Sequence, residues 1–394
     1  MKIHFRRWIA ATVLLSTAFL CSCSNKEPTR PTEGSSTATL CAVGDIFLTD
    51  QMQTDAQTAS GMPDYQPLLS AVIPEISRAD LALGNFEGTF ANSGKGSYPD
   101  AFAAALSRCG FDILQTANSY SVYYGLSGLE RTKSVIREQG MEALGTFVSQ
   151  EEREEQKVLI KEINGIRFAF LAFTKGFNGM GLPADSDYCV NLLYSDYATD
   201  YEEVDRSGIL SLVNAAVAAE PDFIIAALHW GSENVSGISP TQEEITELLL
   251  NNGVDVILGS HSHRVEKVER RTVTDEEGVE RECVIAYGLG DFCATKPGEC
   301  NTSIVLNLEF TRDHADGSHR ISEVSYVPVS TVDNGEGAAN RYTVVPSKEA
   351  VRLYENNYYL RVGEAAYTAM VGDLEDLDET VFPPPETEST EETE

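Results

Sequence analysis

The sequence predicts an α/β protein in which parallel strands alternate with helices and antiparallel strands are added to them. Short apolar runs recur along the chain, and stretches with helical spacing separate them. This strand–helix–strand succession implies parallel pairing with right-handed crossovers. The dipeptide Asn164-Gly165 lies between two apolar runs, and it is the strongest short signal for an antiparallel hairpin. With 42% hydrophobic residues in 394, the chain can bury a substantial core.

The apolar runs predict strands over residues 40–43, 81–83, 111–114, 158–163, 167–173, 223–228, 255–258, 264–271, 282–286, 302–310 and 321–329. Helical spacing predicts helices over residues 100–108, 128–139, 205–219, 241–251 and 347–357. Residues 178–200 contain scattered Gly, Pro, Asp and Tyr, which predicts a long loop or lid.

The N-terminal residues predict export. Three basic residues precede an apolar stretch at 8–20, which is shorter than a typical membrane-spanning helix. Residues 20–23, Leu-Cys-Ser-Cys, resemble the lipobox of bacterial lipoproteins, with Cys23 as the acylated residue. We expect residues 1–23 to be a lipoprotein signal peptide and residues 24–38 a flexible tether, which places the protein outside the cytoplasm on the cell membrane. A plain transmembrane or cleaved signal is the alternative.

The formal charge of −32 is concentrated in acidic runs and in the C-terminal residues. Such a surface repels phosphate backbones, so we expect no nucleic-acid partner. We predict one folded domain over residues 39–360 and an acidic, disordered tail over 361–394.

Polar residues follow several of the predicted strands. In an open parallel sheet, ligands bind at the carboxyl ends of the strands, so these side chains are expected to gather at one rim. Each one alone is more often a turn or capping residue. Their mixture of carboxylate, amide and imidazole suits a divalent metal such as Mn, Zn or Fe. The residues are Asp45, Asn85, Glu87, Asn118, His229, His261 and His263.

His261 and His263 stand two positions apart at the end of an apolar run, in a chain with six histidines. Residues at i and i+2 of an extended segment lie on the same side. We therefore predict that both rings reach one metal centre.

Six short motifs occur in a fixed order between residues 39 and 329: Val43-Gly44-Asp45, Gly84-Asn85-Phe86-Glu87-Gly88, Ala117-Asn118 with Tyr124-Gly125-Leu126-Ser127-Gly128-Leu129, His229-Trp230-Gly231-Ser232-Glu233, Gly259-Ser260-His261-Ser262-His263 and Tyr287-Gly288-Leu289-Gly290-Asp291-Phe292. In this order they resemble the CapA family of capsule synthesis proteins. That family is linked to poly-γ-glutamate capsules, and its domain is similar to calcineurin-like metallophosphoesterases. The resemblance implies a four-layer α-β-β-α metallophosphoesterase-like sandwich of two mixed sheets.

The resemblance also implies roles for individual residues. Asp45 would bind the first metal, Glu87 would bridge, and Asn118, His229, His261 and His263 would complete the metal set. Substrate would contact Asn85, Trp230 and Asp291. Catalysis would fall to His229, Glu233 and Tyr120, with Glu233 orienting His229 or moving a substrate proton.

One departure from the family pattern concerns the catalytic segment. The family usually shows Asn-Asn-His followed by Asp, whereas this chain has Asn118-Ser119-Tyr120 and Tyr123. Ser119 is a poor metal ligand, and Tyr120, with an ordinary pKa of about 10, is a reluctant acid that can still donate a hydrogen bond. Asp291 adds a carboxylate where the family commonly has Asn.

Three functions are consistent with these residues. The first is a metal-dependent hydrolase or transferase acting on a cell-envelope polymer or its phosphorylated carrier. The second is a non-catalytic polymer-handling lipoprotein, and the third is a phosphatase for small substrates. The expected partners are the polymer or its precursor, the membrane through the lipid anchor, and other capsule-assembly proteins. An acidic protein binds a polyanion poorly unless cations in the cleft bridge the charges.

Overall fold

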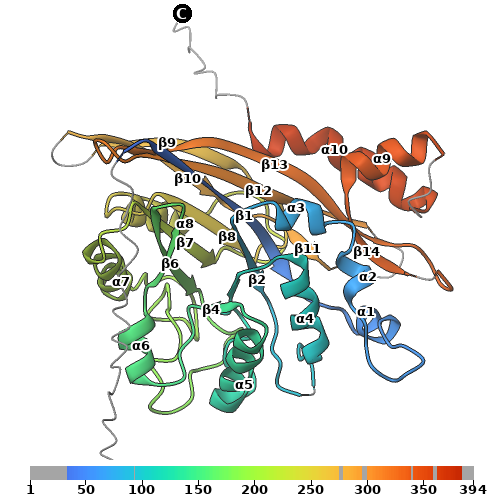
Figure 1. Ribbon diagram of the computed structural model, residues 1–394. Coiled ribbons are helices and arrows are strands. Elements are labelled where there is room, and N and C mark those ends of the chain that lie inside the picture. The colour runs from blue at the N-terminus through green and yellow to red at the C-terminus, as the bar shows by residue number, and fades with distance from the viewer. Residues whose placement is uncertain are drawn as a thin grey trace, which may run out of the picture.

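Two mixed sheets lie face to face between helices (Figure 1). The computed structural model describes residues 33–383 except 93, 275–277, 295–299, 339 and 358–361. The predicted signal peptide, Cys23 and residues 24–32 of the predicted tether lie outside the described residues. Within the described part of the chain, no helix is both long enough and apolar enough to cross a bilayer.

The first sheet has eight strands in the order β14-β13-β12-β1-β2-β3-β4, with β11 paired to β1. Strands β1 to β4 and β11 pair in parallel, while β12, β13 and β14 pair antiparallel. The strands are β1 (Ser35–Ile46), β2 (Leu81–Phe86), β3 (Ile113–Gln115), β4 (Glu142–Leu144), β11 (Asp291–Cys293), β12 (Cys300–Asp313), β13 (His319–Asp333) and β14 (Tyr342–Pro346).

The second sheet has six strands in the order β5-β6-β7-β8-β10-β9. The predicted hairpin at Asn164-Gly165 is present, because β5 and β6 pair antiparallel on either side of it. Strands β6, β7, β8 and β10 are parallel, and β9 closes the other edge antiparallel. The strands are β5 (Leu159–Ile163), β6 (Ile166–Thr174), β7 (Phe223–His229), β8 (Val256–Ser260), β9 (Val268–Thr274) and β10 (Glu280–Ala286).

Three apolar layers account for the four-layer arrangement. The central layer lies between the sheets, where Phe168 of β6 packs on Phe310 of β12 with ring centroids 5.0 Å apart. The outer face of the first sheet packs on helices that include α1 (Asp50–Asp55), α2 (Gln66–Leu69), α3 (Ile73–Ser77) and α4 (Asp100–Cys109). The outer face of the second sheet packs on α7 (Arg206–Ala218) and α8 (Pro240–Leu250). The α-β-β-α prediction is confirmed.

Local signals position the helices as the sequence predicts. Helix α8 begins with a capping box, in which Ser239 and Gln242 satisfy each other's backbone N–H groups, and Pro240 occupies its first turn. Helix α4 ends at Gly110, whose φ of 110° is the left-handed conformation that glycine tolerates. Helices α5 (Gly125–Glu138) and α6 (Gln150–Gln156) follow in the same half of the chain.

The predicted domain boundaries were too narrow at both ends. Strand β1 begins at Ser35, which is paired with Asp313 of β12, so residues 35–38 are part of the sheet and not of a tether. Residues predicted as disordered tail include helix α10 (Glu364–Val381), which packs near α9 (Ser347–Glu355). Ala366, Met370, Leu377 and Val381 of α10 are buried, because they share one face of a helix that is otherwise acidic.

Candidate metal centre

The predicted polar rim exists, and it is formed by strand ends of both sheets. Asp45 and Asn85 lie at the ends of β1 and β2, and Glu87 follows β2 directly. His229 ends β7, and the segment with the two further histidines follows β8. The carboxyl ends of the two parallel sets therefore face each other, and they bring carboxylates from one sheet to imidazoles from the other.

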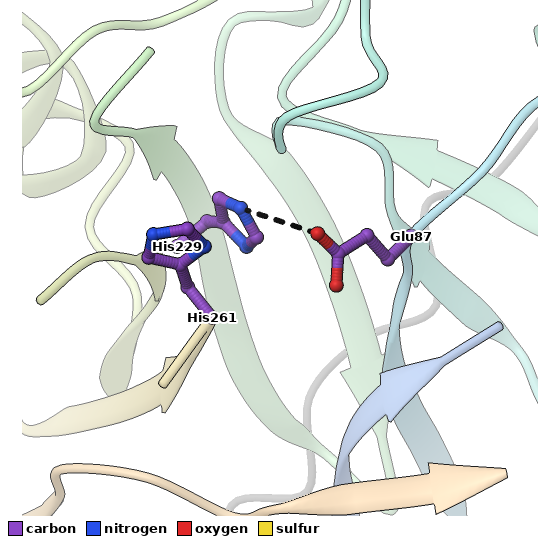
Figure 2. A group of neighbouring side chains, drawn as sticks. All are labelled: Glu87, His229 and His261. Atoms are coloured by element: carbon purple, nitrogen blue, oxygen red, sulfur yellow. Dashed lines mark ion pairs between the residues drawn. The ribbon is translucent and has the colours of Figure 1, made fainter. Parts of the chain in front are cut away.

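The first group of possible ligands consists of Glu87, His229 and His261, whose side chains point toward one another (Figure 2). One ligand atom from each lies within 4.8 Å of the others, and all three residues are buried. His229 Nε2 is 3.8 Å from Glu87 Oε1. Among the described residues, Glu87 Oε2 and His261 Nδ1 are buried without a hydrogen-bond partner. Two orphaned buried atoms in one cluster indicate a site built for a cation.

Burial controls the protonation of this first group. Desolvation holds the pKa of His229 well below its usual value, and burial together with Lys175 lowers that of His261 to about 3. Burial raises the pKa of Glu87 well above its ordinary range. Both imidazoles are therefore neutral at physiological pH, which is the form that binds a metal.

The second group consists of Asp45, His263 and Asp291. His263 Nδ1 is 2.8 Å from Asp291 Oδ1 and 3.5 Å from Asp45 Oδ2. Burial alone would lower the pKa of His263, but the hydrogen bond to Asp291 and the nearby carboxylates raise it to about 10. Burial raises the pKa of Asp45 to about 6, against the opposing charge of His263. The charged ring of His263 therefore offsets part of the negative charge of the two carboxylates.

His261 and His263 belong to different ligand groups, whereas the sequence predicted that both rings reach one centre. Strand β8 ends at Ser260, and both histidines adopt left-handed backbone angles, with φ of 91° and 58°. The period-two rule for extended chain does not apply to such a turn. The ring centroids lie 6.3 Å apart, and each ring joins a different group. Left-handed non-glycine residues are strained, and such strain clusters at functional sites.

Asp45 is held between the two sheets. Its backbone N–H donates to Gly290 O at 2.9 Å. A Cβ at position 44 would lie 2.0 Å from that same oxygen, so the close approach of the two backbone segments requires glycine at Gly44. Asn85 Nδ2 donates to Asp45 Oδ1 at 2.6 Å, and the backbone N–H of His261 donates to Asp45 Oδ2 at 3.1 Å. Asp45 thus contacts the backbone of one histidine and the ring of the other.

Asn118 and Ser119 form hydrogen bonds next to the first group. The Asn118 amide donates to Phe86 O at 2.6 Å and to Asn85 Oδ1 at 3.2 Å, and its oxygen accepts from Tyr120 N at 3.0 Å. Ser119 directs its N–H at 3.2 Å and its hydroxyl at 3.0 Å to Nε2 of His229. The metal role predicted for Asn118 stays a prediction, and the Ser119 contact was missed because residue type alone does not show proximity.

The structure places the predicted substrate residues differently from the sequence. Trp230 is fully buried, donates to Tyr287 O at 3.0 Å and stacks on the Tyr287 ring, so its predicted substrate contact is wrong and it is a core residue. Asn85 is 1% exposed and orients Asp45 instead of facing a cleft. Asp291 belongs to the second ligand group.

A cavity of about 500 Å³ opens beside both groups, and it is lined by Glu87 of the first and His263 of the second. Tyr120 and Glu233 also line it, in keeping with roles at the site, although no hydrogen bond joins Glu233 to His229. Asn178, from the predicted long loop, contributes to the wall. Burial raises the pKa of Tyr120, so its phenol is protonated at neutral pH and can donate a hydrogen bond into the cavity.

The fold and the two ligand groups define an α/β sandwich protein with a candidate centre for divalent ions. The chain belongs to the family described as "Bacterial capsule synthesis protein PGA_cap", whose model matches residues 39–296.

Two curated relatives carry capsule names. The "Capsule biosynthesis protein CapA" of Bacillus anthracis is 23% identical over 265 residues, which cover 64% of this chain and 59% of that protein. The "PGA biosynthesis protein CapA" of Bacillus subtilis (strain 168) is 23% identical over 304 residues, which cover 72% of this chain and 70% of the relative. The chain thus spans less than two thirds of the length of the first relative.

Two solved structures are similar at a lower level. A novel phosphatase from Mycoplasma pneumoniae has a TM-score of 0.42 and 12% identity, covering 75% of this chain and 95% of that one. The calcineurin-like phosphoesterase YfkN from Bacillus subtilis has a TM-score of 0.40 and 14% identity, covering 75% and 91%.

Proposed function

We propose that the protein acts in the synthesis, export or anchoring of a capsule or envelope polymer of the poly-γ-glutamate type, through a metal-dependent hydrolase or transferase cleft. The observation that carries this proposal is the pair of buried ligand groups beside one cavity. Family membership and the names of the two relatives support the polymer assignment.

The ligand chemistry supports Mn, Zn or Fe. Imidazoles suit borderline ions, and neither group contains the thiolates of a structural zinc site. Bound ions would polarise a substrate oxygen and lower the pKa of a bound water. In the first group, the neutral rings of His229 and His261 and the carboxylate of Glu87 would hold an ion. In the second, an ion would displace the proton shared by His263 and Asp291.

The remaining residues of the site would position the substrate and move protons. Asn85 fixes the orientation of Asp45 through its 2.6 Å hydrogen bond. Tyr120 would donate its phenolic proton as a hydrogen bond to a substrate oxygen, because its raised pKa keeps it protonated. Glu233 is exposed at the cavity wall and would accept or return a substrate proton.

The test is the metal content and activity of the purified protein after reconstitution with Mn²⁺ or Zn²⁺. We expect the wild type to bind metal and to cleave a phosphodiester or transfer a polymer end, and His261→Ala to lose the activity together with the metal of the first group. His319→Ala is the matched control, because His319 is exposed on β13 and belongs to neither group. Absence of metal from the reconstituted wild type would overturn the proposal.

A second candidate function is a non-catalytic polymer-binding lipoprotein. The contacts of Ser119 favour it, because its backbone N–H donates to Nε2 of His229, whose lone pair a metal would need, and its hydroxyl lies 3.0 Å from the same atom. Tyr120→His, which restores the residue expected in the family, discriminates the two. Raised metal occupancy or phosphodiester hydrolysis would indicate a decayed catalytic position, and unchanged values would count against that interpretation.

We also propose that the chain is anchored outside the cytoplasm through a lipid on Cys23, on the basis of the lipobox-like residues 20–23. Cys23→Ala should release the protein from the membrane fraction, whereas Cys21→Ala should leave it there. Equal membrane retention of both variants would rule out lipidation at Cys23.

A further inference from the structure

We propose that Lys95 forms an anion-recognition subsite in the cavity beside the two ligand groups, and that Tyr120 and Tyr124 hold it in position. The proposal rests on the proposed function, and it adds the chemical class of group that the cavity recognises, an oxyanion such as a carboxylate or phosphate. Lys95 is the one Lys or Arg among the described residues that line this cavity.

None of the described residues neutralises the charge of Lys95 through an ion pair. Most of the described lysines and arginines form ion pairs, such as Lys157 with Glu154 at 2.8 Å and Lys348 with Asp378 at 3.7 Å. Lys95 forms none with a described residue, although it belongs to an acidic chain with abundant carboxylates and its side chain is exposed. A free cation at the wall of a cavity is available to a ligand anion.

The backbone that carries Lys95 is fixed by hydrogen bonds. Thr89 N donates to Gly96 O at 2.7 Å, and Tyr98 N donates to Thr89 O at 2.8 Å. The phenol of Tyr124 donates to the carbonyl of Lys95 itself at 2.9 Å. Lys95 is therefore presented on an ordered turn, which reduces the entropy that binding would cost.

Two glycines let the tyrosines approach this turn closely. A Cβ on Gly96 would lie 2.3 Å from a ring carbon of Tyr120, and one on Gly94 would lie 2.1 Å from the phenol oxygen of Tyr124. Both glycines have positive φ, at 67° and 106°. Tyr123 links the two tyrosines, with ring centroids 5.4 Å from Tyr120 and 5.1 Å from Tyr124. The tyrosines at 120 and 123, where the family usually has His and Asp, thus belong to the packing that holds the lysine.

Asp50 and Glu233 also line the cavity, so without bound ions its wall is acidic overall. The positive charge that would attract a substrate oxyanion would come from Lys95 and from ions held by the candidate metal groups, whose residues Glu87 and His263 line the same cavity. An anion held between them would contact the ligand residues Glu87 and His263 through the ions and Lys95 directly. This arrangement allows an acidic protein to bind an anionic chain at this cavity.

The test compares binding of two labelled probes, an oligo-γ-glutamate and an oligophosphate, to the Mn²⁺-loaded full chain by fluorescence anisotropy. We expect Lys95→Gln to weaken binding about tenfold, the usual scale for a hydrogen bond between charged groups. Lys348→Gln, on α9, should leave binding unchanged. Tyr124→Phe, which removes the hydrogen bond to the Lys95 carbonyl, should weaken it by a smaller factor. The probe that loses affinity identifies carboxylate or phosphate as the recognised group.

Metal content measured on the same samples separates this inference from the proposed function. Normal metal content with weaker binding in Lys95→Gln supports the subsite. Wild-type binding of both probes by Lys95→Gln, or failure of the metal-loaded wild type to bind either probe, overturns the subsite and leaves the metal centre standing. A wild type that takes up no metal overturns the proposed function, and a Lys95-dependent affinity in that protein would still support the subsite.

Discussion

The two ligand groups contain the same kinds of side chain but differ in charge. In the first, His229 and His261 face a single carboxylate, and burial keeps both rings neutral. In the second, His263 lies between Asp45 and Asp291, and these carboxylates keep its ring protonated despite burial. The difference shows that the number of carboxylates near a buried imidazole decides whether the ring itself is neutral or protonated before a metal binds.

The largest expected effect comes from removing one histidine of each group. His261→Ala should abolish metal binding at the first group, because it removes one of three clustered ligand side chains. His263→Ala should empty the second group and leave the first loaded. Titration calorimetry with Mn²⁺ or Zn²⁺ on both variants measures this separation. Loss of all metal from both variants would show that the two histidines act on one centre.

Asn85 links the two groups, so its replacement should affect both. Asn85 Nδ2 is 2.6 Å from Asp45 Oδ1 and 3.4 Å from His229 Nδ1. We expect Asn85→Ala to weaken metal binding by roughly 10–100-fold, as loss of an outer hydrogen-bond partner usually does. The same calorimetry measures it, with a circular dichroism spectrum to verify folding. An effect confined to one group would mean that Asn85 does not couple them.

A smaller effect is expected from Tyr120→Phe, which keeps the ring that packs on Gly96 and removes only the hydroxyl. If the phenol donates a hydrogen bond to the reacting oxygen, kcat should fall about tenfold while metal content is unchanged. Steady-state kinetics on a phosphodiester, with metal analysis of the same sample, measures both. Unchanged kcat would limit Tyr120 to its packing role.

The smallest effect concerns the segment that carries the histidines. Glu266 is buried, its Oε2 has no hydrogen-bond partner among the described residues, and burial raises its pKa to about 7. Because the folded-state pKa exceeds the ordinary value, the carboxyl group imposes no cost at a pH below about 4.5. The cost grows as the pH rises through 7 and is constant above it.

Glu266→Gln should therefore stabilise the metal-free protein by about 1–3 kcal/mol at pH 8, and the gain should shrink toward pH 4.5. Urea unfolding at both pH values measures this difference. A gain independent of pH would exclude titration of Glu266 as its cause. Metal binding at the two groups should not change, because Glu266 belongs to neither.

Much of the fold was predictable because its signals are local. Apolar runs such as those of β6 and β7, the Asn164-Gly165 turn and the glycine after α4 each specify a short piece of structure. Helix α10 was missed because its acidic composition outweighed the spacing of four buried apolar residues. Strand β11 is three residues long, too short for a periodic signal, yet it carries Asp291.

The sequence predicted which strand ends lie close together, and it did not predict how their side chains divide into two groups. Strand ends correctly brought Asp45, Glu87 and the histidines together. The division into two groups depends on the left-handed backbone conformation of His261 and His263. No residue in this segment predicts that conformation from the sequence. Trp230 was misplaced because a motif position does not show burial. The role proposed for Lys95 was missed because it depends on a tertiary contact, the hydrogen bond from Tyr124 to the Lys95 carbonyl.

The central claim is that His261 and His263 serve separate ligand groups. A crystal structure of the protein with Mn²⁺ or Zn²⁺, read by anomalous scattering, tests it most directly. We expect one anomalous peak bound by Glu87, His229 and His261, and another bound by Asp45, His263 and Asp291. A single peak bound by both His261 and His263 would contradict the claim.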